Sequence, residues 1–235
     1  MLAQVAVLLL LAGAAGLSAA AWTVGLGYGA ALNLLLTRAL VRSGESLGPA
    51  GLVTLARATL IGGVLALAVE DAGRPQHALV LVPLVVVALL GDFVDGWVAR
   101  RTGTTSVTGA RFDMEVDAFA MMVLSVYAAH VAGAWVLLLG LARYAFVVAC
   151  WALPWMRAQL PPRYWRKVVV AYVDVALAAS LLPNRWTTLT LAIAVLLIAE
   201  SFGRDVWWLR RRAATERVNQ EPTAARVGSG HATLR

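Results

Sequence analysis

The chain has 235 residues, of which 60% are hydrophobic and only 14% are charged, and its mean hydropathy is +0.75. This composition excludes an ordinary soluble protein and a disordered one, and it indicates an integral membrane protein. The single cysteine excludes an internal disulfide. We expect the net charge of +7 to reflect topology in the membrane, and we expect no nucleic-acid partner.

Hydrophobic segments of about twenty residues, the length that spans a bilayer, recur along the whole chain. They predict an all-α polytopic membrane protein. In chain order the predicted helices are 3–21, 24–41, 52–69, 78–99, 110–131, 134–153, 167–183 and 186–207.

The N-terminal third is almost continuously apolar, and only Gly25, Gly27 and Gly29 indicate where its first helix ends. The alternative for residues 1–21 is a secretory signal, although the positive charge that begins such signals is absent. We expect three parts: a transmembrane helical pair at 1–42, a six-helix domain at 43–207, and a basic, disordered cytosolic tail at 208–235.

Cations gather on one side of the predicted spans, where they outnumber those of the other side, Arg74 and Arg185. Because cytoplasmic segments of membrane proteins are rich in arginine and lysine, we expect this side and both termini in the cytoplasm. The cations of this side are Arg38, Arg42, Arg100, Arg101, Arg111, Arg157, Arg163, Arg166, Lys167 and Arg210, Arg211 and Arg212.

Four carboxylates lie inside one of the most apolar stretches. Asp92 and Asp95 are three residues apart, and Asp113 and Asp117 are four apart, so each pair projects from one face of a helix. The polar segment 101–108 between the pairs predicts a short connection of two antiparallel helices. The four side chains are therefore expected to converge.

Converging carboxylates repel one another unless a cation binds them. With no histidine or cysteine nearby, oxygen ligands favour Mg²⁺, with Mn²⁺ as the alternative. Gly96 and Gly109 have no side chains and leave room for a phosphate beside the acids. The simpler alternative is a solvated helix-loop-helix at the membrane surface.

The pattern Asp92-x-x-Asp95-Gly96-x-x-Ala99-Arg100, followed after eight residues by Gly109-x-x-x-Asp113-x-x-x-Asp117, resembles the signature of the CDP-alcohol phosphotransferase family, class I membrane enzymes. The resemblance spans residues 51–203. It implies a six-helix bundle, here with two extra N-terminal helices, and a homodimer. It also implies that the four aspartates hold Mg²⁺ on the diphosphate of a CDP-linked donor, and that Asp117 takes the proton of the acceptor hydroxyl.

The resemblance also implies donor-binding residues. Gly96, Arg100 and Ser106, with Gly109 beside the acids, are expected to lie against the nucleotide or its phosphates. Upstream, the segment from Gly51 to Arg57 is similar to the family's Asn-x-x-Thr-x-x-Arg element, with glycine in place of asparagine. Thr54 and Arg57 are the donor contacts expected there.

A second group of cations is a candidate acceptor site, since basic residues hold the acceptor phosphate in relatives that use phosphorylated polyols. Generic attraction to anionic lipid is the alternative for the loop 157–167. Arg143 lies near the middle of a predicted span and needs a partner, such as Asp174, or an anionic ligand. The candidates are Arg143, Arg157, Arg166 and Lys167.

These features predict a phosphatidyltransferase of phospholipid biosynthesis in a bacterial cell membrane, with its site facing the cytoplasm. CDP-diacylglycerol would be the donor, and a small polar alcohol, with glycerol 3-phosphate or inositol phosphate favoured, would be the acceptor. The alternatives are transfer of a headgroup from a CDP-alcohol to a lipid hydroxyl and, from other classes, a cation transporter or a non-catalytic scaffold.

Overall fold

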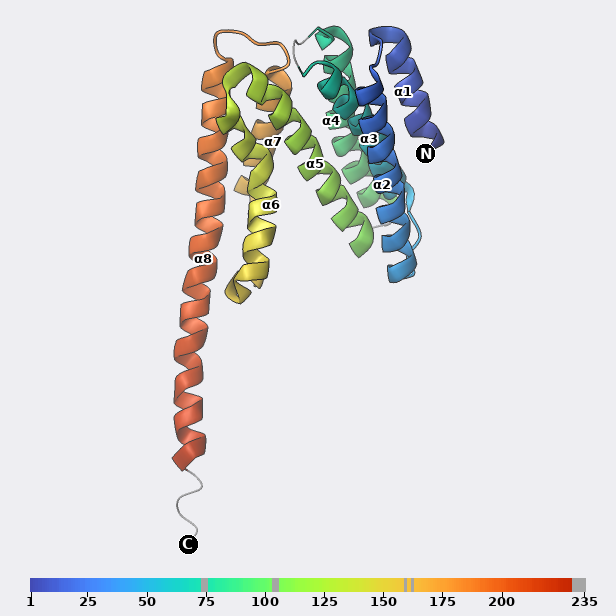
Figure 1. Cartoon of the computed structure of the whole chain (residues 1–235). Coiled ribbons are helices and arrows are strands. Elements are labelled where there is room, and N and C mark those ends of the chain that lie inside the picture. Colours follow the sequence, from blue (N-terminus) through green and yellow to red (C-terminus); the bar gives the residue numbers. More distant parts are fainter. Residues whose placement is uncertain (73–75, 103–105, 159, 162, 230–235) are drawn as a thin grey trace.

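The structure, a computed structural model, describes residues 1–72, 76–102, 106–158, 160–161 and 163–229, without the side chains of residues 93, 99, 100, 102 and 216–229. In these residues the chain is helical and contains no strand, which confirms the predicted all-α class (Figure 1). The elements are α1 (Leu2–Ala15), α2 (Ala19–Ser43), α3 (Pro49–Glu70), α4 (Ala78–Thr102), α5 (Val107–Ala132), η1 (Ala134–Val136), α6 (Leu137–Ala152), η2 (Pro154–Arg157), α7 (Tyr164–Ala179) and α8 (Thr187–Ser229).

Five stretches in the described part of the chain are long and apolar enough to cross a membrane: α2, α3, α4 as far as Val98, α5, and Ala134–Ala152. The protein is thus an integral membrane protein. Helix α1 has 14 residues, about 21 Å at the rise of an α-helix. Helix α1 is therefore shorter than the predicted span over 3–21. It is also shorter than the hydrocarbon core of a bilayer, which is about 30 Å thick.

The break between α1 and α2 lies earlier than the glycines at 25–29 suggested. Gly16 ends α1 with a φ of +70°, and the Ser18 hydroxyl accepts a hydrogen bond from the Ala21 backbone N–H at the start of α2. Gly25 and Gly29 lie inside α2, where a Cβ would come within 2.7 Å of the side chains of Leu8 and Gln4 on α1. These glycines permit close packing of two helices rather than breaking one.

Helix α3 is central, since it packs against α1, α2, α4 and α5. A single large apolar cluster joins α3 to α5, α7 and α8 through buried residues such as Leu67, Leu124, Val173 and Leu191. Polar side chains carried by α3 are consequently surrounded by other helices rather than by lipid.

One end of the bundle collects the arginines, at the bottom of Figure 1. Helices α2, α4 and α6 end there, and α3, α5 and α7 begin there. We call it the arginine-rich end; its cations include Arg42, Arg101, Arg111, Arg157 and Arg166.

Helix α8 continues to Ser229, beyond the predicted end at residue 207 and into the segment that was expected to be disordered. In Figure 1 it extends past the other helices at the arginine-rich end. The segment 208–221 is rich in arginine, alanine, glutamate and glutamine, which favour helix, and Leu209 within it is buried. Low hydrophobicity was therefore a poor guide to the end of this helix.

Candidate metal and nucleotide site

The four aspartates come from the end of α4 and the beginning of α5, near the arginine-rich end. The start of α5 is set by Ser106, whose hydroxyl accepts a hydrogen bond from the backbone N–H of Gly109 at 2.9 Å. A serine in this position satisfies an N–H group that the first turn leaves free. From this cap, Asp113 and Asp117 follow two and three turns into the helix.

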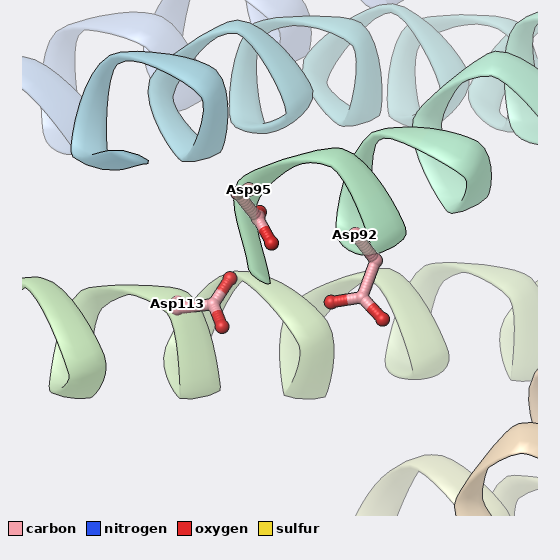
Figure 2. Close-up of side chains that lie close together, drawn as sticks. All are labelled: Asp92, Asp95 and Asp113. Atoms are coloured by element: carbon pink, nitrogen blue, oxygen red, sulfur yellow. The ribbon is translucent and has the colours of Figure 1, made fainter. Parts of the chain in front are cut away.

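Asp92, Asp95 and Asp113 form a cluster in which one carboxylate oxygen from each residue lies within 4.8 Å of the others. Figure 2 shows the two side chains of α4 and the one of α5 directed toward one another across the two helices. Asp95 is almost completely buried, whereas the Asp92 side chain is 47% exposed and that of Asp113 is 33% exposed. The cluster is thus closed on one side and accessible on the other.

The donor set of this cluster fits a hard divalent cation, since it consists only of carboxylate oxygens. Ligand oxygens that share one Mg²⁺ at about 2.1 Å lie at most about 4.2 Å apart. The separations of up to 4.8 Å therefore require only small side-chain rotations. The predicted fourth ligand, Asp117, is outside this three-residue group.

All four carboxylates surround one guanidinium group, that of Arg57 on α3. Its Nη1 lies 2.6 Å from an oxygen of Asp95, 2.8 Å from Asp113 and 3.4 Å from Asp92, and its Nη2 lies 2.6 Å from Asp117. Arg57 is 4% exposed. A buried charge requires such partners, and here one cation compensates part of the negative charge of the site.

The path of the Arg57 side chain is also constrained by α4. Its Nε donates a hydrogen bond to the backbone carbonyl of Ala88 at 3.1 Å. A Cβ on Gly91 would lie 2.6 Å from the Arg57 Cγ. Glycine at position 91 therefore lets the arginine cross α4 to reach the carboxylates.

Four predicted donor-binding residues line one cavity of about 160 Å³, together with Asp95 and Asp113. They are Thr54, Gly96, Ser106 and Gly109. The Thr54 hydroxyl lies 3.3 Å from the Ala50 carbonyl and 3.4 Å from an Asp95 oxygen. Of the two other candidates, Arg57 does not line this cavity, and the side chain of Arg100 lies outside the described residues.

The end of α2 and its connection to α3 also contribute to this cavity, which the sequence did not indicate. Leu40, Ser46 and Leu47 line it, and a Cβ at Gly51 would lie 2.8 Å from the Leu47 Cδ1. The glycine that replaces the family's asparagine thus gives Leu47 its place. The sequence signal for this contact is the departure from the family pattern at Gly51.

Glu45 fastens the same connection to α5. Its carboxylate accepts a hydrogen bond from the backbone N–H of Thr108 at 3.2 Å. Hydrogen bonding with Thr108 lowers the pKa of the Glu45 carboxyl below its ordinary value. The N-terminal helices are therefore connected to the start of α5, beside Ser106 and Gly109, which line the cavity.

Arg143 is paired with Glu115 of α5, with the Arg143 Nη2 and the Glu115 carboxylate 2.6 Å apart. The suggested pairing with Asp174 is wrong. Asp174 lies on α7, which packs against α4 and α5. It brings a fifth carboxyl group toward the other aspartates, which sequence spacing alone had not connected with them.

The remaining acceptor candidates have separate surroundings. Arg157 donates to the backbone carbonyls of Cys150 and Trp151 at the end of α6. Arg166 contacts Asp205 at 3.3 Å and the Pro161 carbonyl. These two residues, with Arg143 and the exposed Lys167, line neither the 160 Å³ cavity nor the larger groove described below.

Comparison with known proteins identifies a family for this chain. No curated protein matches the chain. Residues 47–200, well over half of the sequence, match the model of a family described as CDP-alcohol phosphatidyltransferase. The match begins just before α3 and ends within α8, so it includes Arg57 and the aspartates that lie near it, Asp92, Asp95, Asp113, Asp117 and Asp174. The chain belongs to the CDP-alcohol phosphatidyltransferase family, whose members are membrane transferases of phospholipid synthesis.

Proposed function

We propose that this protein transfers a phosphatidyl group from CDP-diacylglycerol to a small polar alcohol and releases CMP. The observation that carries the proposal is the convergence of Asp92, Asp95 and Asp113 beside a cavity lined by Thr54 and Gly96. A diphosphate needs a hard cation and close backbone approach, and both are available at one place here.

The depth of the site supports a lipid-linked donor. Arg57 is eight residues from the first residue of α3, about 12 Å along the helix axis. A diphosphate at this depth lies near the boundary between headgroups and hydrocarbon, where acyl chains can remain between helices or in the lipid. We place this end in the cytoplasm because it carries most of the cations.

The metal would be held by Asp92, Asp95 and Asp113 and, when bound, would neutralise the diphosphate and polarise its phosphorus. The acceptor oxygen forms a bond to the phosphorus that carries diacylglycerol, and the bond from this phosphorus to the oxygen of CMP breaks. Asp117 accepts the hydroxyl proton. Its contact with Arg57 directs the carboxylate toward the cluster.

The charges around the site bear on the acceptor. The sequence favoured a phosphorylated polyol because of four cations, but Arg143, Arg157 and Arg166 have partners within the protein. These partners leave fewer free cations to hold a second phosphate, which supports an uncharged or zwitterionic alcohol, such as inositol or serine, over glycerol 3-phosphate or inositol phosphate. A homodimer remains part of the proposal through the family resemblance.

The test is CMP release from CDP-diacylglycerol by the purified protein in detergent with Mg²⁺. The acceptors are inositol, serine, glycerol 3-phosphate, inositol phosphate and none, and Asp117→Asn is the control. We expect acceptor-dependent release that the variant loses, and Mn²⁺ is expected to replace Mg²⁺. Magnesium-dependent CMP binding without release from CDP-diacylglycerol would contradict this donor and favour a CDP-linked headgroup. Absence of CMP binding would favour a transporter or scaffold.

A further inference from the structure

A large groove lies between α2 and α5, apart from the carboxylate site. Its volume is about 740 Å³, within the range of about 300–1,000 Å³ typical of ligand pockets. Leu32 and Leu35 belong to its apolar lining, while Arg42 and Arg111 line it from the ends of α2 and α5 that lie at the arginine-rich end. The groove therefore has an apolar body and a cationic mouth.

Stacked aromatic rings line the groove away from Arg42. Tyr28 of α2 stacks on Phe119 of α5 with 4.9 Å between the ring centroids. The Tyr28 hydroxyl donates a hydrogen bond to the Ala58 carbonyl of α3 at 3.0 Å, which holds the ring in place. In Figure 1, α5 leans across the bundle and comes toward the end of α2 at the arginine-rich end, while α2 remains beside α3. Tyr28 and Phe119 thus join the two helices in a part of the groove lining that is distant from Arg42 along α2.

The mouth is electrostatically suited to an anion. The one carboxylate that lines the groove, Glu115, is paired with Arg143. Arg42 and Arg111 are exposed, and no carboxylate in the described part of the chain lies within ion-pair distance of either. Their positive charge is therefore available to a ligand.

The length of the groove agrees with one lipid leaflet. From Tyr28 to Arg42 are fourteen helical residues, about 21 Å along the axis of α2. A bilayer is about 40–45 Å thick with its headgroups, so one leaflet is about 20–22 Å. A lipid whose chain ends near Tyr28 and Phe119 therefore has its phosphate at the level of the two arginines.

We propose that this groove binds one anionic phospholipid of the leaflet at the arginine-rich end, with an acyl chain along α2 and α5 and its phosphate at Arg42 and Arg111. The site is distinct from the carboxylate site, because Phe112 and Val116 of α5 line the groove whereas Asp113 faces the other cavity. The α2 wall also precedes residues 47–200, so it belongs to this chain outside the family match. The proposal does not depend on the proposed reaction.

The test uses the thermal unfolding of the purified full chain in detergent, titrated with dioleoyl phosphatidylglycerol or dioleoyl phosphatidylcholine. We expect phosphatidylglycerol to half-saturate the stabilisation at a concentration about thirtyfold lower than phosphatidylcholine does. Two arginines attract the net negative headgroup of the first lipid, whereas choline compensates the phosphate charge of the second. The variant Arg42→Gln with Arg111→Gln should lose this preference. The single variants serve if the double variant does not fold.

Two further variants distinguish the groove from general surface charge. Arg38→Gln removes an exposed arginine of α2 that does not line the groove, and it should preserve the preference. Ala39→Trp fills the groove and should weaken the binding of both lipids. An unchanged preference in the double variant, or an equal loss in Arg38→Gln, would overturn the proposal. So would an Ala39→Trp variant that binds lipid normally but disrupts a dimer detected by cross-linking, since a second copy would then occupy the groove.

Discussion

Two faces of α5 meet different partners. One face carries Asp113 and Asp117 and contacts a buried arginine of α3, whereas the other carries Phe112 and Val116 and borders the groove against α2. The polar face is defined by residue types at helical spacing, which are visible in the sequence. The apolar face looks like any lipid-facing surface until the angle between two helices makes it a groove. Charge at a site can thus be recognised from sequence, while shape requires the packed helices.

The largest expected effect is a loss of activity when an acid on the polar face of α5 is changed, but not when an acid on the other face is changed. Asp117→Asn should reduce kcat by about a hundredfold or more, because the variant has no base for the acceptor proton. Thermal stabilisation by CMP with Mg²⁺ should remain. The matched control is Glu115→Gln, which changes an acid two residues away that pairs with Arg143. Equal losses of kcat in both variants would contradict the special role of Asp117.

The next effect concerns the cation within the site. Arg57→Gln leaves four carboxylates without their shared guanidinium, and removal of one partner of a buried ion pair costs about 3–5 kcal/mol of stability. We expect a loss toward the lower end of this range in EDTA, because three of the carboxylates are partly exposed. The loss should be smaller in excess Mg²⁺, because a metal can replace the missing charge. Thermal unfolding under both conditions measures the difference.

Arg143→Gln is the control for that prediction. It also removes one arginine from an ion pair, but this pair is partly exposed and should contribute less than about 1 kcal/mol. Its stability should not depend on Mg²⁺. If Arg57→Gln were equally stable in EDTA and in Mg²⁺, the guanidinium would not compensate the metal-binding carboxylates.

A smaller effect is expected where α4 lets the arginine pass. Gly91→Ala introduces a methyl group 2.6 Å from the Arg57 Cγ, and such overpacking costs about 1–3 kcal/mol. The metal-dependent stabilisation should increase, as in Arg57→Gln but less. Gly27→Ala is the control, because its Cβ would have no neighbour within 4 Å. That variant should be neutral or more stable, since alanine favours helix.

The smallest effect concerns the connection between α2 and α3. The pKa of Glu45 is lowered in the folded protein by its hydrogen bonding with Thr108. Its contribution to stability is therefore fully present above the ordinary glutamate pKa of about 4.3 and is lost as the pH falls through the lowered value. The difference in melting temperature between the native protein and Glu45→Gln should be small at pH 7 and vanish in acid. A difference that persists in acid would exclude this linkage.

The fold was predictable to the extent that it depends on hydrophobic length. The helices at 52–69, 78–99 and 110–131 correspond to α3, α4 and α5 within a few residues. The predicted boundary between the first two helices was wrong, because glycines such as Gly25 and Gly29 can indicate either the end of a helix or a close contact between two helices. The contacts of these glycines with Leu8 and Gln4 of α1 show that the second interpretation is correct. At the other end, helix-forming residues extend α8 where hydropathy predicted no structure.

The site was predictable from the spacing of acids but not in its partners. The convergence of Asp92, Asp95 and Asp113 followed from helical periodicity and a short connection, and the structure brings them together. The central place of Arg57, the contribution of Asp174 and the pairing of Arg143 with Glu115 did not follow, because each joins residues of different helices. No periodicity within one helix reports its rotation relative to another.

The sequence by itself determined that this protein is an all-α membrane protein of the CDP-alcohol phosphatidyltransferase family with an acidic motif across two helices. Composition, span length and residue spacing are local properties of the chain, so they can be read without a fold. Only the tertiary structure decided that one buried arginine joins the four carboxylates and that α2 and α5 line a common groove. Both depend on the positions and angles of helices that are distant in sequence, which packing of the whole bundle sets.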